Sequence, residues 1–179
     1  MPADARLVPF VPAHLSAMAA MLDDPDVQRF TRIPVPPPPG FPELWMREYE
    51  EGRRTGTREV FAVVDTRDGG FLGVAVVPSI DAVARTAELG YVIARAARGR
   101  GVATATLLRL TDWAFAELDP KRLELWINAD NEASKGVAAR CGYTYEGTMR
   151  AMHFKQDLWV DTEIWSRLPT DPRPAAAPT

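Results

Sequence analysis

The chain has 179 residues, the size of one domain, and its 46% hydrophobic and 25% charged residues are typical of an ordinary globular protein. Its formal net charge of −3 argues against nucleic acid or an anionic membrane as the main partner. No apolar run reaches the roughly 18 residues that span a bilayer, and the N-terminus lacks the pattern of a signal peptide. Cys141 is the single cysteine, so no disulfide forms within the chain, and we expect a reducing, cytoplasmic compartment.

The first half of the chain predicts one strand, three helices and then three strands. The first strand and the helices are expected at 5–11, 14–22, 25–30 and 43–54. Four consecutive prolines at 36–39 exclude helix and central strand, so we expect a stiff, extended loop before the third helix. The next two strands read as a hairpin joined by a Gly-containing turn, and another turn is expected near Pro78 to Val83. These three strands are predicted at 59–65, 71–77 and 86–94.

The second half predicts a long amphipathic helix, a buried strand, a short helix that ends before Gly142, and two closing strands. They are expected at 101–118, 122–127, 131–141, 143–150 and 158–168. The strand–helix–strand unit over 86–127 implies a right-handed crossover and one parallel strand pair. The predicted fold class is α/β (α+β), a single domain with a mixed, mostly antiparallel sheet of about seven strands flanked by helices. We expect the domain to cover 1–168 and the Pro/Ala-rich tail, 169–179, to be disordered.

The turn between the strand at 86–94 and the long helix has the clearest chemical meaning. It reads Arg98-Gly99-Arg100-Gly101-Val102-Ala103. A helix start leaves about four backbone N–H groups without partners and carries roughly half a positive charge, so it attracts anions. The glycines let a phosphate approach the backbone, and the two arginines add positive charge. The turn therefore predicts a phosphate-binding site.

Three phosphate-binding patterns compete for this turn. A P-loop needs a lysine at the helix start, and Gly101-Val102-Ala103 has none. A dinucleotide fingerprint needs a third small residue where Thr104 stands. The third pattern, Gln/Arg-x-x-Gly-x-Gly/Ala, is matched by Arg98, Gly101 and Ala103, and it resembles the pyrophosphate-binding motif of the GNAT superfamily of acyltransferases. The plain alternative is a Gly-containing turn with exposed arginines.

A second segment carries the same resemblance. Asn131 and Ser134 form an Asn-x-x-Ser pattern at a helix start, and that helix ends in a basic–x–Gly–aromatic turn, Arg140 to Tyr143. With the strand around Glu88, this resembles the RimJ/RimL-type branch, the N-terminal acetyltransferases of ribosomal proteins. The sequence departs from the wider family at Ala138, where many members carry a tyrosine that acts as the acid for the leaving thiolate.

The resemblance, which extends over residues 5–168, implies an enzyme that transfers an acetyl group from acetyl-CoA to a primary amine by direct attack in a ternary complex. No metal is expected, because two isolated histidines are too few for a metal site. The resemblance implies that the strand after Tyr91 pairs with the pantetheine arm and that the turn holds the pyrophosphate. The residues implied in coenzyme binding are Val92, Ile93, Ala94, Arg98, Gly99, Arg100, Gly101, Val102, Ala103, Thr104, Asn131 and Ser134.

Three residues are the candidates for catalysis. Glu88 is the expected general base, acting through a water. Ser134 is implied to hydrogen-bond the sulfur as the thiolate forms, and Asn131 to hold the arm or an ordered water. Each has a structural alternative: Glu88 as an acid that never meets the substrate, and Asn131 as a helix N-cap with Ser134 supporting it.

The acceptor is left open by the sequence. The resemblance favours the α-amino group of a protein N-terminus, and a small-molecule amine is the alternative, with residues 30–49 expected to roof its site. The sequence also leaves room for a larger acyl donor such as succinyl-CoA, for a binding module that holds acyl-CoA without turnover, and for a nucleotide-dependent enzyme. The oligomeric state is open as well, and a homodimer is one candidate.

Overall fold

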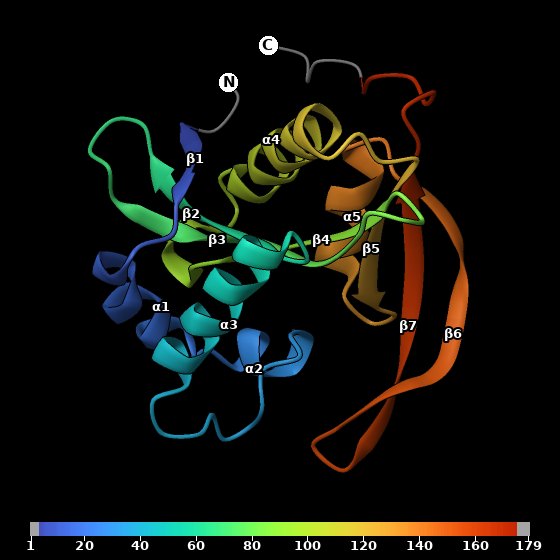
Figure 1. The fold of residues 1–179 in the computed structure, drawn as a ribbon. Helices are drawn as coiled ribbons and strands as arrows, with labels where there is room; N and C mark the ends of the chain where they lie inside the picture. Colours follow the sequence, from blue (N-terminus) through green and yellow to red (C-terminus); the bar gives the residue numbers. More distant parts are fainter. Residues whose placement is uncertain (1–3, 175–179) are drawn as a thin grey trace.

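The protein is built around one seven-stranded sheet with helices on both faces, as the computed structural model in Figure 1 shows for residues 4–174. The strands are β1 (Ala5–Pro9), β2 (Glu59–Asp65), β3 (Phe71–Asp81), β4 (Thr86–Ile93), β5 (Arg122–Asn128), β6 (Thr144–Lys155) and β7 (Leu158–Arg167). The helices are α1 (Leu15–Met21), α2 (Pro25–Phe30), α3 (Phe41–Thr55), α4 (Val102–Glu117) and α5 (Glu132–Arg140), with short 3₁₀ turns η1 (Pro12–His14) and η2 (Arg95–Ala97).

The strands lie in the order β1-β2-β3-β4-β5-β7-β6, and among the described strands β4 and β5 form the one parallel pair. That pair is short, because it runs from Thr86 opposite Arg122 to Glu88 opposite Glu124. Beyond it, β4 stays paired with β3 as far as Ile93, and β5 stays paired with β7. The sheet therefore splits after Glu88, and no described strand pairs with the edge of β4 that faces β5 beyond this point.

Two hydrophobic clusters hold the helices on the two faces. On one face α4 and α5 cover the sheet, and Leu107 and Leu110 of α4 are fully buried there against Leu123 of β5. On the other face α1 and α3 pack through Met18 and Tyr49 against β2 and β3. Because strand side chains alternate between faces, neighbouring residues of one strand belong to different clusters. The two faces of the sheet beside the split consequently carry different side chains.

The predicted order of elements and the parallel pair are confirmed, but several boundaries differ. β3 continues to Asp81, where a turn was expected from Pro78. Its pairing with β4 shifts register between Val76 and Ser79, and a proline is tolerated at such an irregularity because it needs no ladder N–H there. β6 likewise runs on to Lys155 around a shift. The helix expected at 14–22 is present as α1, and the 3₁₀ turn η1 precedes it. Residues 31–40 contain neither helix nor strand, as the prolines predict.

The end of the predicted tail falls outside the described residues, which stop at 174. Within the described part, Asp171 closes a turn by exchanging hydrogen bonds with Leu168. Of the helices that the structure describes, none has the length and apolarity needed to cross a membrane.

Gly73 holds β3 close to β4 at the split. Its φ is +153°, and a β-carbon there would lie 2.2 Å from the backbone oxygen of Val92. We expect Gly73→Ala to lower the free energy of unfolding by about 3 kcal/mol or more, since both the clash and the backbone conformation are unfavourable. Gly69→Ala is the matched control, because its φ is +74° and no atom lies within 4 Å of the added carbon. The control should lose only about 1–2 kcal/mol in urea denaturation, and equal losses would contradict the close approach.

Candidate functional site

The unpaired edge of β4 forms one wall of the candidate site. The Ala94 N–H donates to Leu72 of β3, and the Val92 oxygen also points to β3, toward Gly73. Because backbone groups of a strand alternate in direction, those of Tyr91 and Ile93 point the other way, into the split. The Ile93 oxygen accepts from Arg98 Nε at 3.0 Å, which leaves its N–H and the backbone of Tyr91 for a ligand. Of the three residues expected to pair with an extended arm, Ile93 thus has the suitable orientation.

The turn that follows β4 presents backbone N–H groups at the start of α4. Gly99 and Gly101 have φ values of +72° and +77°, a conformation that glycine adopts without strain. Gly101 is the N-cap residue, so no side chain covers the helix start, and the first turn of α4 has no acidic residue. The N–H groups of the first helical residues, Val102 to Thr104, have no carbonyl four residues earlier within the helix. This turn therefore has the geometry of an anion site.

The Arg98 side chain fixes this turn in place. Its guanidinium donates at 2.8 Å to Asp24 and at 2.8 Å to Asp26, at the start of α2, in addition to the Ile93 oxygen. Burial alone would raise the pKa of Asp24, but the Asp26 N–H and the Arg98 charge outweigh burial and lower it. Arg100 is more exposed and lies 3.7 Å from Asp65. The backbone amides and Arg100 are consequently the groups best placed to receive an anion.

Glu88 lies on the face of the sheet opposite α4 and α5, since its neighbours Ala87 and Leu89 are buried in that core. Its carboxylate accepts two hydrogen bonds from Arg32, at 2.7 and 3.2 Å, and its side chain is 14% exposed. The same guanidinium lies 5.1 Å from the ring centre of Trp126 on β5. Glu88 is therefore accessible from the side of α2 and α3, where a cation already occupies it.

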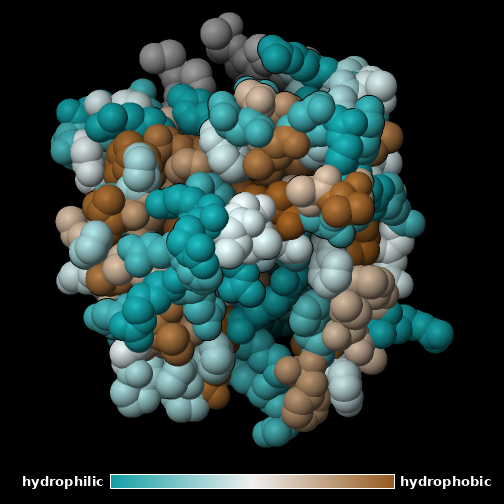
Figure 2. Space-filling model, in the orientation of Figure 1, coloured by the Kyte–Doolittle hydropathy of each residue, from teal (hydrophilic) through white to brown (hydrophobic). Residues whose placement is uncertain are grey.

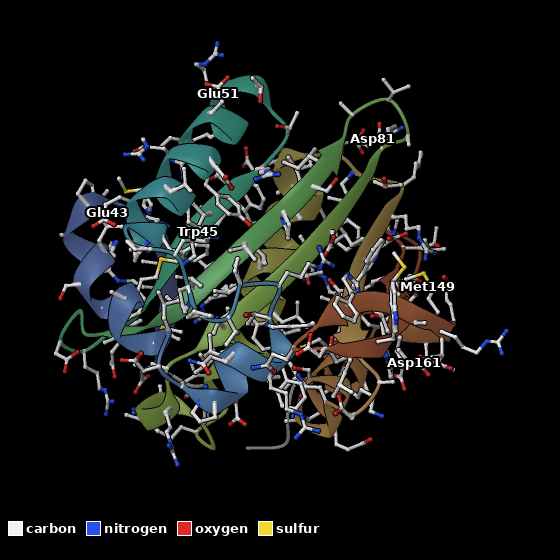
Figure 3. All side chains as sticks on the ribbon, turned by 90° about the horizontal axis from the view of Figure 1, so that it is seen from below. Glu43, Trp45, Glu51, Asp81, Met149 and Asp161 are labelled. Carbon is white, nitrogen blue, oxygen red and sulfur yellow. The ribbon has the colours of Figure 1, made fainter. Side chains whose placement is uncertain are left out.

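The segment from Arg29 to Arg32 crosses from α2 to the far half of the sheet. Arg29 forms an ion pair with Asp130, and its carbonyl accepts from Asn128 at 3.4 Å. Lys155 of β6 donates to the Thr31 carbonyl. Figure 3 shows α3, marked by Glu43, Trp45 and Glu51, and the β6–β7 pair, marked by Met149 and Asp161, on opposite sides of β3 and β4. Figure 2 shows a hollow bordered mainly by hydrophilic residues between the α2 region and the β6–β7 hairpin.

Asn131 and Ser134 begin α5 on the other face. Asn131 is the N-cap, and its Oδ1 accepts from the Ser134 N–H at 3.1 Å, so the structural role expected for this pair is present. The Ser134 hydroxyl lies beside Tyr91, where it lowers the pKa of that phenol against a larger rise caused by burial. The start of α5 therefore faces β4 across the split. Within residues 4–174, no group of three or more metal-ligating side chains comes together.

The structure brings further residues into the site besides the predicted catalytic and coenzyme-binding ones. Arg32 and Trp126 surround Glu88, and no local pattern marks them because Arg32 is 56 residues from Glu88 in the chain. Tyr91 belongs to the strand predicted at 86–94, but its position relative to α5 depends on the packing. His153 donates or accepts at 3.0 Å with Thr162 and stacks edge-on near Trp126; burial lowers its pKa, so the neutral ring is favoured.

The model of the acetyltransferase (GNAT) domain matches residues 5–144, and the chain therefore belongs to this family. A putative ribosomal N-acetyltransferase of Bacillus subtilis, YdaF, is 37% identical over 101 residues, which are 56% of this chain and 55% of that protein. The chain thus spans about half the length of this curated relative, and similarly of a ribosomal-protein-serine acetyltransferase of Escherichia coli.

Solved structures share the fold over almost the whole chain. RimJ of Mycobacterium smegmatis, in complex with CoA-disulfide, has a TM-score of 0.84 at 21% identity and covers 92% of this chain and 82% of its own. Spermidine N-acetyltransferase of Vibrio cholerae, in complex with CoA and spermine, has a TM-score of 0.81 at 19% identity, covering 94% and 97%. At this identity the likeness establishes the fold alone.

The Arg98 ion pairs should contribute measurably to stability. We expect Arg98→Gln to lower the free energy of unfolding at pH 7 by about 2–4 kcal/mol, because the Asp24 carboxylate, 9% exposed, loses its cation. Arg54→Gln, which breaks the exposed pair with Glu51, is the matched control and should leave the free energy of unfolding almost unchanged.

The effect of Arg98→Gln should also depend on pH. The folded pKa of Asp24 lies below its ordinary 3.8, so the stabilisation is complete above that value and is lost as the pH falls through the folded pKa. Chemical denaturation from pH 7 to pH 3 should therefore show the difference between Arg98→Gln and the unmodified protein shrinking in acid. A difference that grows in acid would contradict this assignment.

Proposed function

We propose that the protein transfers an acetyl group from acetyl-CoA to a primary amine. The observation that carries the proposal is the unpaired edge of β4 leading directly into the N–H-rich turn at Gly99 to Gly101. Acetyl-CoA has an extended arm with amide groups and a diphosphate at its far end, and the site offers a matching strand edge and anion turn in the same order. The family and the CoA named with the structural relatives support this ligand.

The coenzyme would be held mainly by backbone groups. The amides of the turn, from Gly99 to Thr104, and Arg100 would bind the diphosphate, and the pantetheine arm would pair with Tyr91 and Ile93 as an added strand. A backbone N–H in this edge would hold the thioester oxygen while negative charge develops there. In other enzymes, removal of one such donor raises the barrier by about 3–4 kcal/mol.

Glu88 would act as the general base, through a water, on the acceptor side. An amine arrives mainly protonated near neutral pH and must lose a proton to attack the acetyl carbon. In the structure Glu88 binds Arg32, so an arriving amine would have to displace this guanidinium or bind beside it. Once the amine attacks, the carbon–sulfur bond breaks, the sulfur leaves as a thiolate, and Ser134 would donate a hydrogen bond to it.

The acceptor class that we favour is the α-amino group of a protein N-terminus. Two similar proteins support it: YdaF is named as a putative ribosomal N-acetyltransferase, and RimJ belongs to the RimJ/RimL-type branch. A small amine is the second class, supported by the similarity to a spermidine acetyltransferase. The hydrophilic hollow in Figure 2 suits either, since both carry a cation. We also propose a cytoplasmic location and leave a homodimer as a state to be measured.

One observation favours a binding module without turnover. Ala138 stands where many members of the family have a tyrosine that acts as the general acid for the leaving thiolate. It is fully buried and offers no proton donor. Release of free thiol from acetyl-CoA or succinyl-CoA, measured with a panel of N-terminal peptides and polyamines, separates the two functions. Tight acetyl-CoA binding with no thiol release for any amine would support the binding module.

The anion turn is tested by Gly101→Val. The substitution adds a branched side chain at φ +77° at the start of α4, so we expect the dissociation constant for CoA in titration calorimetry to rise at least tenfold. Gly56→Val is the matched control, because Gly56 has φ +71° but ends α3, remote from the turn. Normal CoA affinity in a folded Gly101→Val protein would show that the phosphate assignment is wrong.

The base is tested by Glu88→Gln. We expect turnover to fall about 100-fold or more, with little change in CoA affinity, because the amide cannot take the proton of the amine. Glu59→Gln is the control: it disturbs a similar ion pair, between Glu59 of β2 and Arg53 of α3, and should leave turnover unchanged. Initial rates of thiol release provide the measurement, and equal rates for the two variants would remove Glu88 from this role.

A further inference from the structure

The hydroxyl of Tyr91 is buried and has no hydrogen-bond partner among the described residues. Tyr91 lies on β4 and packs against the core formed with α4 and α5. A buried hydroxyl without a partner is costly and uncommon in folded proteins. Tyr143, the other buried phenol near α5, pairs its hydroxyl with Thr111 at 2.8 Å. The environment of Tyr91 therefore differs from that of an ordinary core tyrosine.

The Tyr91 phenol lies against one face of α5. The groups that influence its pKa belong to Ser134, Cys141 and Arg140, and Ser134, Ala138 and Cys141 follow helical spacing on one face. The Cys141 thiol donates to the Thr104 carbonyl, and Ala138 has no polar group. Ser134 is thus the hydroxyl beside Tyr91 that is suited to accept a hydrogen bond from it.

The Ser134 hydroxyl also lacks a hydrogen bond among the described residues. Its N–H is bound by Asn131, which fixes the backbone, but no hydrogen bond to Ser134 Oγ forms within the part of the chain that the structure describes. A serine hydroxyl rotates freely, so a single bond to sulfur would not orient it. A donor on its far side would direct the hydroxyl hydrogen away from that donor and toward the ligand.

We propose that Tyr91 is a positioning residue that donates a hydrogen bond to Ser134 Oγ when acetyl-CoA is bound, so that the Ser134 hydroxyl points at the thioester sulfur. This inference rests on the proposed acetyltransferase function. The Tyr91 phenol then supports the leaving sulfur through Ser134. It does so on the face of α5 where Ala138 itself has no hydroxyl to donate.

The electron and proton movements follow from this arrangement. The amine nitrogen forms a bond to the acetyl carbon, the carbon–sulfur bond breaks, and the sulfur keeps the electron pair. The proton that the ammonium loses before the attack leaves through water to Glu88, and the proton that the nitrogen loses after the attack goes to solvent water. Ser134 and Tyr91 donate hydrogen bonds in series without losing their protons. Burial raises the pKa of Tyr91 to about 12, so the phenol stays a neutral donor near neutral pH.

The decisive experiment measures the thiolate fraction of CoA bound to the full-length protein, by ultraviolet absorbance against pH, with the S-methyl-CoA complex as the blank. Burial raises the pKa of Cys141 to about 11, so neither Cys141 nor Tyr91 titrates in the range of interest. In Tyr91→Phe we expect the thiolate fraction at a fixed pH to fall about three- to tenfold. Turnover should fall by a similar factor, with the Michaelis constant for acetyl-CoA unchanged.

Two further variants separate positioning from packing. Ser134→Ala should show the same loss, and adding Tyr91→Phe to it should change neither quantity by more than about twofold, since the two act in series. Tyr143→Phe, the matched control, should leave the thiolate fraction and turnover unchanged but lower the melting temperature, because it removes a satisfied hydrogen bond. Tyr91→Phe should not lower the melting temperature.

The outcomes distinguish this inference from the function on which it rests. If CoA does not bind, or no amine releases thiol, both are overturned. If the unmodified protein binds CoA and turns over, but Tyr91→Phe keeps its thiolate fraction and turnover within twofold, only the role of Tyr91 is overturned. A full additional loss in the double variant would show that Tyr91 acts independently of Ser134, which also overturns it.

Discussion

The separation of β4 from β5 after Glu88 is the constraint on which the candidate site depends. Each strand keeps an antiparallel neighbour beyond that point, β3 for one and β7 for the other, so the split leaves the facing edges of β4 and β5 unpaired among the described residues, between two well-formed half-sheets. An open strand edge is ordinarily a liability that proteins cover. An extended ligand with amide groups can cover it, and the turn after Ala94 lies where the anionic end of such a ligand would arrive.

The alternation of side chains along β4 assigns different tasks to the two faces. Glu88 points toward α2 and α3, where Arg32 and Trp126 make the surroundings cationic and aromatic. Tyr91 follows three positions later, and because side chains of a strand alternate between its faces, it points toward α5 and Ser134. Proton removal from an amine and support of a leaving sulfur would therefore occur on opposite sides of one strand. A thioester lying along the β4 edge would be reached by both.

Helix α2 connects the two ends of the site. It has six residues, too few to be stable as an isolated helix, so its position depends on its contacts. Asp24 and Asp26 at its start hold Arg98 of the anion turn, while Arg29 and the following residues bind the far half of the sheet. The turn and the acceptor side consequently share one short element.

The sequence by itself determined the order of the elements, the parallel β4–β5 unit, the glycine turn and the cap at Asn131. These depend on periodicity, positive φ angles and helix ends, which are local properties. The tertiary structure alone decided the extension of β3 past Pro78, the binding of Arg98 by Asp24 and Asp26, and the direction of the backbone at Tyr91 and Ile93. The physical reason is that a strand's free groups and an ion's partners are set by neighbours far away in the chain. The Arg32–Glu88 pair and the unpartnered Tyr91 hydroxyl likewise exist only once the helices have packed on the sheet.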